Sequence, residues 1–365
     1  MKAAPREDPF FPVSAGKPDA GQGRAQARLR VGEFGWIWFG LIAVFAVSVV
    51  VAPGTLRPDT LASLLPFAGV LTVASVGQTA VIQQRGLDLS IPGTMAMCAL
   101  AMAKMEIDHS LLIAAGAAVV LAACIGALNG LIVTKFSVTP IITTLAVNAL
   151  LVGGAFTYVN GSAVSISATM TEFTRAKPAG VPAIVIIAIA LVVLLALALS
   201  KSVAGRRFIL VGASPSAARA AGIQVTRYQV GAYVVSSICA GFAGVLLAGY
   251  TGTATSDLGN PFLLLTIAAV VIGGTPLSGG RGSLIATAAA ALFLTQLDQL
   301  SSSLGAPSSV QYFVQAGALV LATTLRYLAF GSMFRGCPNR RLPPPAPTAG
   351  AAGIESHNQV EGLSS

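Results

Sequence analysis

The sequence is poor in charged residues, which make up only 10% of its 365 residues. A soluble domain carries about 25%. Here 55% of the residues are apolar and the mean hydropathy is +0.79. This balance predicts a membrane protein. The net charge of +9 does not indicate nucleic-acid binding, because the basic residues lie at the ends of apolar runs.

Residues that usually carry catalysis or metal binding are scarce. The only two histidines are His109 and His357, and no phosphate loop of the form G-x-x-x-x-G-K-[ST] is present. The spacing of the four cysteines is not that of a disulfide or metal motif. They are Cys98, Cys124, Cys239 and Cys337. We therefore predict no catalytic residue and no metal site in this chain.

Apolar runs long enough to cross a bilayer recur along the chain. A crossing needs about 20 mostly apolar residues, and it is helical because lipid offers the backbone no hydrogen-bond partner. The predicted fold class is all-α, a polytopic membrane bundle of about ten transmembrane helices. The segments are 34–53, 61–82, 87–103, 111–134, 139–159, 181–200, 228–250, 262–276, 283–304 and 309–330.

Lysine and arginine are divided unevenly between the two sides of this topology. With both termini in the cytoplasm, 18 of the 22 basic residues fall on the cytoplasmic side, as the positive-inside rule expects. The predicted organisation is a disordered tail over 1–33, a membrane domain over 34–330 and a second disordered tail over 331–365, both tails cytoplasmic. The largest cytoplasmic loop is 201–227.

That loop contains VGASPSAARAAGIQV, residues 211–225, which has the start and stop signals of a very short helix. Ser214 is a good N-cap, Pro215 suits the first helical position, and Gly222 suits the left-handed residue after the end. The predicted helix covers 215–221. Its side chains include Ala217, Ala218 and Arg219.

Two polar interruptions, residues 83–97 and 272–286, each lie between two crossings and share the pattern G-x-x-L-S. Gly- and Pro-broken segments in corresponding halves of a chain indicate a translocation region. The alternative is a pair of tight turns with Ser90 and Ser283 as helix caps. Asn129 and Asn148 are predicted to be buried amides, and for them the alternative to a solute contact is interhelical hydrogen bonding. The pathway candidates are Gly86, Asp88, Ser90, Asn129, Asn148, Gly273, Gly274 and Ser278.

Asp88 is the only acidic residue in either interruption. A carboxylate near the hydrocarbon boundary needs a partner or a role. Three roles are open: an ion pair with Arg85, a cap on the next helix, or a gate in which Asp88 and Ser90 line the pathway.

Small residues recur every four positions in two of the crossings, a spacing that lets helices approach closely. Bundle packing is the favoured interpretation. The residues are Ala122, Gly126, Gly130, Ala240, Gly244 and Ala248.

Three sequence segments, taken together, form a specific pattern. GLDLSIPGTMAM at 86–97, GRRFILVGASPSAARAAGI at 205–223 and IAAVVIGGTPLSGGRGS at 267–283 occur in order. The chain resembles, over about 60–325, the ribose-type sugar permeases of ABC importers, a family that also includes branched-chain amino-acid permeases. Ser214-Pro215-Ser216 and Pro92 depart from the usual pattern.

The resemblance implies a transporter subunit of the bacterial inner membrane, passing a monosaccharide such as a ribose-like pentose, and not an enzyme. The implied partners are cytoplasmic ABC ATPase subunits, which would hold the ATP and magnesium, a periplasmic solute-binding protein, a second permease chain and membrane lipid. The short helix at 215–221 would dock on the ATPase. No cofactor is expected on this chain and no nucleic acid among its partners.

The alternatives are an ABC permease for branched-chain amino acids or nucleosides and, from other classes, an ion-coupled secondary carrier or channel, or a membrane scaffold or intramembrane enzyme. The near absence of acidic residues within the crossings disfavours the carrier.

Overall fold

The computed structural model describes residues 22–334; residues 1–21 and 335–365 lie outside its described part. The chain divides into two compact units, Met1–Thr323 and Thr324–Ser365, and the arrangement given below is that of the first. α1 begins at Gln22, inside the range predicted as a tail, and α13 ends at Phe334. The remaining residues of both predicted tails are outside the described residues.

Nearly all the regular structure is helical, with one two-stranded antiparallel pairing. The elements are α1 (Gln22–Val51), η1 (Pro53–Leu56), α2 (Pro58–Gln83), α3 (Ile91–Met105), α4 (Leu111–Lys135), α5 (Pro140–Tyr158), β1 (Val164–Ser165), α6 (Ala168–Arg175), η2 (Pro178–Gly180), α7 (Ala183–Lys201), α8 (Val203–Ala213), α9 (Pro215–Ala220), α10 (Val225–Thr251), β2 (Thr253–Ala254), α11 (Phe262–Ile272), α12 (Leu284–Ser303) and α13 (Ser308–Phe334).

Each of the ten predicted crossings falls on one of these helices. Six of them are long and apolar enough to cross a membrane, namely α2, α4, α5, α7, α10 and α12. The other four contain shorter apolar stretches, at Gly35–Val51, Ile91–Met105, Phe262–Ile272 and Ser309–Leu321. The all-α polytopic membrane fold is confirmed.

Two helices, α3 and α11, lack four residues of their predicted range at one end, and both of these ends lie at the polar interruptions. α3 begins at Ile91 instead of residue 87, because the backbone N–H of Ser90 binds the Asp88 carboxylate, a local bond that competes with helix formation. α11 ends at Ile272 instead of residue 276. There Gly274 has φ +93°, a conformation that stops a helix.

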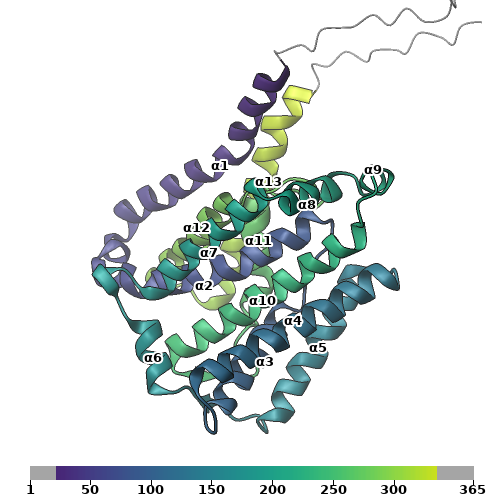
Figure 1. Ribbon diagram of the computed structural model, residues 1–365. Coiled ribbons are helices and arrows are strands. Elements are labelled where there is room, and N and C mark those ends of the chain that lie inside the picture. The colour runs from purple at the N-terminus through teal and green to yellow at the C-terminus, as the bar shows by residue number, and fades with distance from the viewer. Residues whose placement is uncertain (1–21, 335–365) are drawn as a thin grey trace, which may run out of the picture. The chain divides into compact units, whose positions relative to one another are not determined.

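α10 crosses the middle of the bundle and contacts α2, α3 and α4 (Figure 1). The contacts are close because glycines leave room for backbone. A Cβ on Gly126 of α4 would lie 2.5 Å from the carbonyl oxygen of Tyr233 in α10. A Cβ on Gly244 of α10 would lie 2.2 Å from the carbonyl oxygen of Met95 in α3. The small-residue stripes of α4 and α10 therefore serve helix packing, as predicted.

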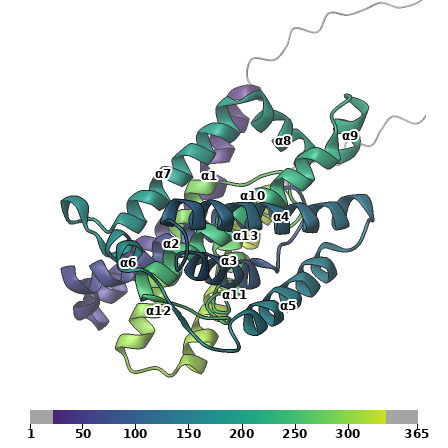
Figure 2. The ribbon, with the colours of Figure 1, turned by 60° about the horizontal axis from the view of Figure 1, so that its bottom comes forward.

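The two ends of α10 lie beside different connecting elements. Its first turns contact α8 and α9, which follow each other at one end of the bundle (Figure 2). Its last turn leads into β2, which pairs antiparallel with β1 through Val164 opposite Ala254 and Ser165 opposite Thr253. The loop 201–227 and the β1–β2 pair therefore lie at opposite ends of α10.

Candidate functional site

The first polar interruption is an unwound connection between α2 and α3. Helix α2 ends at Gln83, and Arg85 has φ 64°, a left-handed conformation that is uncommon for a residue with a side chain. Gly86 follows because a Cβ there would lie 2.5 Å from the hydroxyl oxygen of Tyr233. The chain then runs without helical structure to Ser90.

Four buried polar residues are joined by hydrogen bonds at this connection. Ser90 Oγ donates to Asp88 Oδ1 at 2.6 Å, and Ser236 Oγ of α10 donates to Asp88 Oδ2 at 2.8 Å. Asn129 Nδ2 of α4 donates to Ser90 Oγ at 2.8 Å. We call Asp88, Ser90, Asn129 and Ser236 the polar cluster; none is more than 1% exposed. It ties the unwound segment to two central helices.

Side chains of helix α5 accept hydrogen bonds from backbone N–H groups beside the polar cluster. Thr144 Oγ1 accepts from the N–H of Leu89 at 3.0 Å, and Asn148 Oδ1 accepts from the N–H of Gly93 at 2.8 Å. Since Asn148 and Asn129 both bond to groups on or beside another helix, the interhelical interpretation of the two amides is confirmed.

Of the roles open to Asp88 and Ser90, the structure corrects two. Ser90 is the N-cap residue of α3, but its side chain makes no capping bond; its hydroxyl is held by Asp88 instead, so the cap interpretation is wrong for Ser90. The Arg85 guanidinium donates to the carbonyl oxygens of Gly212 and Ala213. Arg85 and Asp88 therefore have different partners, and the interpretation of the two as a local ion pair is wrong.

The second interruption does not reach the polar cluster. Gly273 packs against the start of α12, where a Cβ would lie 2.8 Å from the backbone nitrogen of Thr287. Gly274 turns the chain, and Ser278 is exposed. The structure thus brings Asp88, Ser90 and Asn129 together, with Gly86 and Asn148 beside them, and places Gly273, Gly274 and Ser278 elsewhere.

The two interruptions nevertheless meet. The N–H of Gly280 donates to the carbonyl oxygen of Gln83 at 2.9 Å. At the end of the second interruption, Ser283 Oγ accepts from the N–H of Ala286 at 3.3 Å. Ser283 is therefore the helix cap that the turn interpretation predicts, unlike Ser90.

The short helix in the large loop is present as α9, with both of its predicted caps. Ser214 Oγ accepts from the N–H of Ala217 at 3.3 Å, and Pro215 is the first helical residue. Gly222 has φ +74°. Behind it the N–H of Ile223 donates to the carbonyl oxygen of Ala218 at 2.9 Å, which is the closing bond of a Schellman motif.

One face of α9 is turned toward its own chain. Ala218 is 4% exposed and packs in a small cluster with Val211 and Val225. Ala217 and Arg219 are exposed. Of the small residues on the helix predicted to dock, Ala218 therefore faces its own chain, because a helix of under two turns beside two buried valines buries the side chain that faces them.

The sequence analysis missed α8, which directly precedes α9. Ser202 Oγ accepts from the N–H of Gly205 at 2.8 Å and caps its start. The local signal was Ser202, a good N-cap residue, directly before the segment VAGRRFILVGA. Ser236 and Thr144 were missed as well, because each lies in an apolar helix without a local motif.

A cavity of about 530 Å³ lies between α2, α10, α11 and α12, in the half of α2 away from α9. Asp298, an acidic residue within the crossing predicted over 283–304, lines it and accepts from Gln315 Nε2 at 3.1 Å. The polar lining residues are Ser63, Thr251, Thr295, Asp298 and Gln299, and the apolar ones include Phe67 and Phe262.

Among the described residues, no three His, Cys, Asp or Glu side chains are grouped to hold a metal ion. Cys98, Cys124 and Cys239 are free thiols, and Cys337 lies outside the described residues. In the polar cluster two hydroxyls donate to the carboxylate and the amide of Asn129 donates to one of these hydroxyls, an arrangement that suits internal hydrogen bonding.

Comparisons with known proteins give consistent results. The ribose import permease protein of Escherichia coli strain K12 is 32% identical over 77% of this chain and 90% of its own. That of Bacillus subtilis strain 168 is 31% identical over 79% and 91%. The autoinducer 2 import system permease protein of Enterobacter sp. strain 638 is 29% identical over 79% and 86%. No solved structure matches the chain.

A family model covers most of the membrane domain. The family described as "Branched-chain amino acid transport system / permease component" matches residues 60–323, a range that begins in α2 and ends in α13. It contains the polar cluster, both interruptions and α9. The chain belongs to this family of membrane transport permeases, and within it the chain is similar to sugar ABC permeases.

Proposed function

We propose that this chain forms the membrane pathway of an ABC importer for a monosaccharide or a related small polyhydroxylated solute. Two of the relatives named above are ribose import permeases and one is an autoinducer 2 import permease. In the proposed assembly, two permease chains, identical or related, enclose the pathway. A periplasmic binding protein delivers the solute, and a separate pair of cytoplasmic ATPases holds ATP and magnesium.

The observation that carries the proposal is the construction of α9. It has an N-terminal hydroxyl cap and a left-handed glycine at its end, and it is fixed to its own chain through Ala218. Such a helix transmits a push, whereas a flexible loop absorbs it. Its outer face carries only small side chains and Arg219, which suits insertion into a groove of an ATPase.

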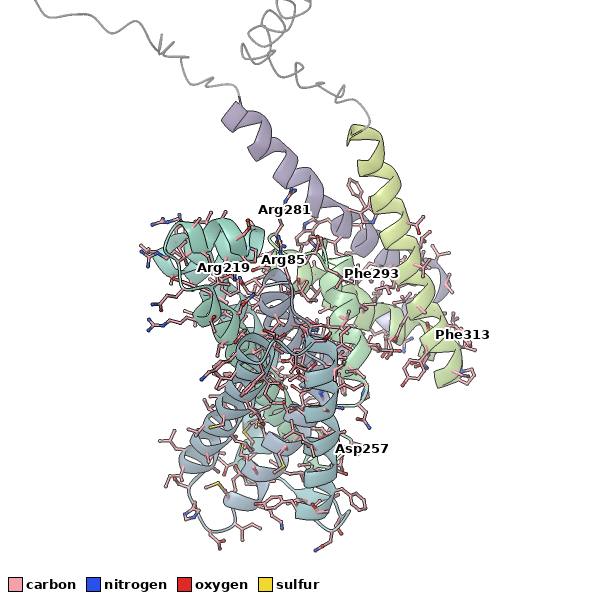
Figure 3. The ribbon with its side chains drawn as sticks, turned by 90° about the vertical axis from the view of Figure 1, so that its right-hand side faces the viewer. Arg85, Arg219, Asp257, Arg281, Phe293 and Phe313 are labelled. Carbon is pink, nitrogen blue, oxygen red and sulfur yellow. The ribbon has the colours of Figure 1, made fainter. Side chains whose placement is uncertain are left out.

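The proposed orientation follows from charge. α9 lies on the side that receives 18 of the 22 lysine and arginine residues, so it faces the cytoplasm, as do both termini. Figure 3 shows Arg85, Arg219 and Arg281 toward one end of the bundle and Asp257 toward the other. In this orientation the 530 Å³ cavity lies in the outer half of the membrane.

We assign the polar cluster to the pathway region, where its bonds change between states of the transport cycle. Ser90 and Ser236 donate to the carboxylate and Asn129 donates to Ser90, and hydrogen bonds in such a buried chain strengthen one another, so the loss of one weakens the rest. Selectivity is left to the binding protein, since the cavity wall is mainly apolar.

The test is reconstitution with an ATPase and a periplasmic binding protein, whose genes we expect beside that of this chain. Proteoliposomes are given labelled ribose, autoinducer 2, leucine or a nucleoside, with and without ATP. We expect uptake of ribose or autoinducer 2 only with ATP and binding protein. Uptake of leucine or the nucleoside alone would contradict the solute class. Uptake without ATP that an ionophore abolishes would instead establish an ion-coupled carrier.

A further inference from the structure

The unwound segment after α2 holds the end of α8. Arg85 Nε donates to the carbonyl oxygen of Gly212 at 2.9 Å, and Arg85 Nη2 donates to that of Ala213. Gln84 Nε2 donates to the carbonyl oxygen of Phe208 at 2.7 Å. The last carbonyls of a helix have no partner within it, and a guanidinium there also complements the helix dipole. Arg85 therefore completes the C-terminus of α8.

The C-terminus of α8 is also closely packed against the two polar interruptions. A Cβ on Gly212 would lie 2.3 Å from the carbonyl oxygen of Gln83. That oxygen accepts from the N–H of Gly280 at 2.9 Å, and a Cβ on Gly280 would lie 2.9 Å from Cα of Ala213. Three backbones thus meet directly. Since close-packed interiors transmit displacement, the end of α8 does not shift alone.

The end of α8 is also joined firmly to α9. Ser214 alone separates the two helices and caps the second. Val211 of α8, Ala218 of α9 and Val225 of α10 pack together behind this joint. A force on α9 therefore reaches the two carbonyls that Arg85 holds.

On its other side, Arg85 leads into the polar cluster. Its φ of 64° is that of the left-handed residue in a Schellman motif, because the N–H of Arg85 donates to the carbonyl oxygen of Ile82 and the N–H of Gly86 to that of Val81. Asp88 follows three residues later and binds Ser90 and Ser236. Arg85 is thus held by α2 through its backbone and by α8 through its guanidinium, so a displacement of α8 would pull on the short segment that leads to the carboxylate.

We propose that Arg85 is a positioning residue that transmits displacement of α9 to the polar cluster. The inference rests on the proposed ATPase docking at α9. It adds the internal connection, which runs from α9 through the α8 carbonyls and Arg85 to Asp88, and from there to α4 and α10. Arg85 touches neither solute nor ATP in this role; its function is to make the ATPase and the pathway move together.

The test compares Arg85→Gln, Arg85→Lys and Arg57→Gln in the complete reconstituted complex. Arg57 stands at the other end of α2 and is exposed, so its variant matches the charge change without the contact. The measured quantity is solute imported per ATP hydrolysed, with the amount of assembled complex determined separately. For Arg85→Gln we expect normal assembly, continued ATP hydrolysis and a fall in this ratio of about tenfold or more, as for the loss of charged hydrogen bonds.

Arg85→Lys should give an intermediate ratio, because one ammonium group does not span two carbonyls as a guanidinium does. Arg57→Gln should leave the ratio unchanged. A second readout is the rate at which a thiol reagent labels Leu87→Cys, in a chain whose four native cysteines are replaced by alanine. ATP should change this rate in the parent chain and not in the Arg85→Gln chain.

Several results would overturn the proposal. An unchanged ratio in Arg85→Gln would do so, as would a fall that Arg57→Gln shares. Failure of both Arg85 variants to assemble would give Arg85 a folding role only. Loss of ATPase binding would make it a docking contact. A parent complex that shows no ATP-driven uptake contradicts the proposed function itself, and is thereby distinguished from all of these.

Discussion

Two adjacent serines on α10 have equally buried side chains and differ in one contact. Ser236 Oγ donates to Asp88 Oδ2, whereas Ser237 Oγ has no hydrogen-bond partner in the structure. Both are fully buried. Losing one partner of a buried pair costs more than losing an unpaired hydroxyl, so the two positions report separately on the polar cluster.

Ser236→Ala should therefore destabilise the protein by about 1–3 kcal/mol, because it leaves a carboxylate oxygen without its donor. Ser237→Ala, the matched control, should change stability little or raise it slightly. Thermal unfolding of the purified chain in detergent measures both. Equal effects of the two variants would show that the Ser236–Asp88 bond contributes no stability of its own.

Asp88→Asn changes the charge of the polar cluster and keeps its shape. The amide retains an oxygen that accepts from Ser90, and Ser236 can rotate its hydroxyl to accept from the new NH2 group. We expect the variant to insert and to assemble with the ATPase, yet to lose most uptake. Uptake assays normalised to assembled complex provide the measurement. Full uptake would remove Asp88 from the pathway residues and leave the family membership untouched.

Helix α9 separates two functions on its two faces. Ala218 packs against its own chain and Ala217 is exposed. Ala217→Trp should leave thermal stability of the isolated permease within about 0.5 kcal/mol, as is usual for a surface site, and should weaken ATPase association. Ala217→Ser, which keeps a side chain of nearly the native size, is the control. Co-purification and ATPase titration measure association; normal association and normal uptake in Ala217→Trp would show that the outer face does not dock.

How much of these elements could be predicted depends on whether the signal is local. The caps of α9 are local, since Ser214, Pro215 and Gly222 fix its ends by their own backbone chemistry, and they were predicted. The inward face of Ala218 depends on Val211 and Val225, and so few residues give no reliable periodicity. Helix α8 was missed because its two arginines and the flanking polar residues read as a loop.

The polar cluster shows the same limit. Asp88, Ser90 and Asn129 stood out as polar residues in apolar surroundings. Ser236 is 148 residues from its partner and lies in an ordinary helical context. Its role follows only from the crossing of α10 with the unwound segment. The Gly273, Gly274 and Ser278 candidates were chosen by analogy between the two interruptions, and the fold places them apart from Asp88.

For the whole molecule, the division of basic residues predicts which loops face which side of the membrane. Reporter fusions at about residues 107, 170 and 255 should read as periplasmic, and fusions at about 135 and 215 as cytoplasmic, by the positive-inside rule. Residues 107 and 170 lie at the end of the bundle opposite α9, close to the β1–β2 pair. A periplasmic signal at 215 would contradict both the orientation and ATPase docking at α9.

The glycine contacts of α10 determine how the bundle can deform. Backbone approaches backbone at Gly126 and again at Gly244. At these two points no long side chain that could change its rotamer separates the helices. Any gliding of α10 along α3 or α4 would drive a Cα or carbonyl of one helix into the other. We therefore expect these helices to resist sliding past one another, so that a displaced unwound segment would change its bonds to α4 and α10 without moving either helix along its axis.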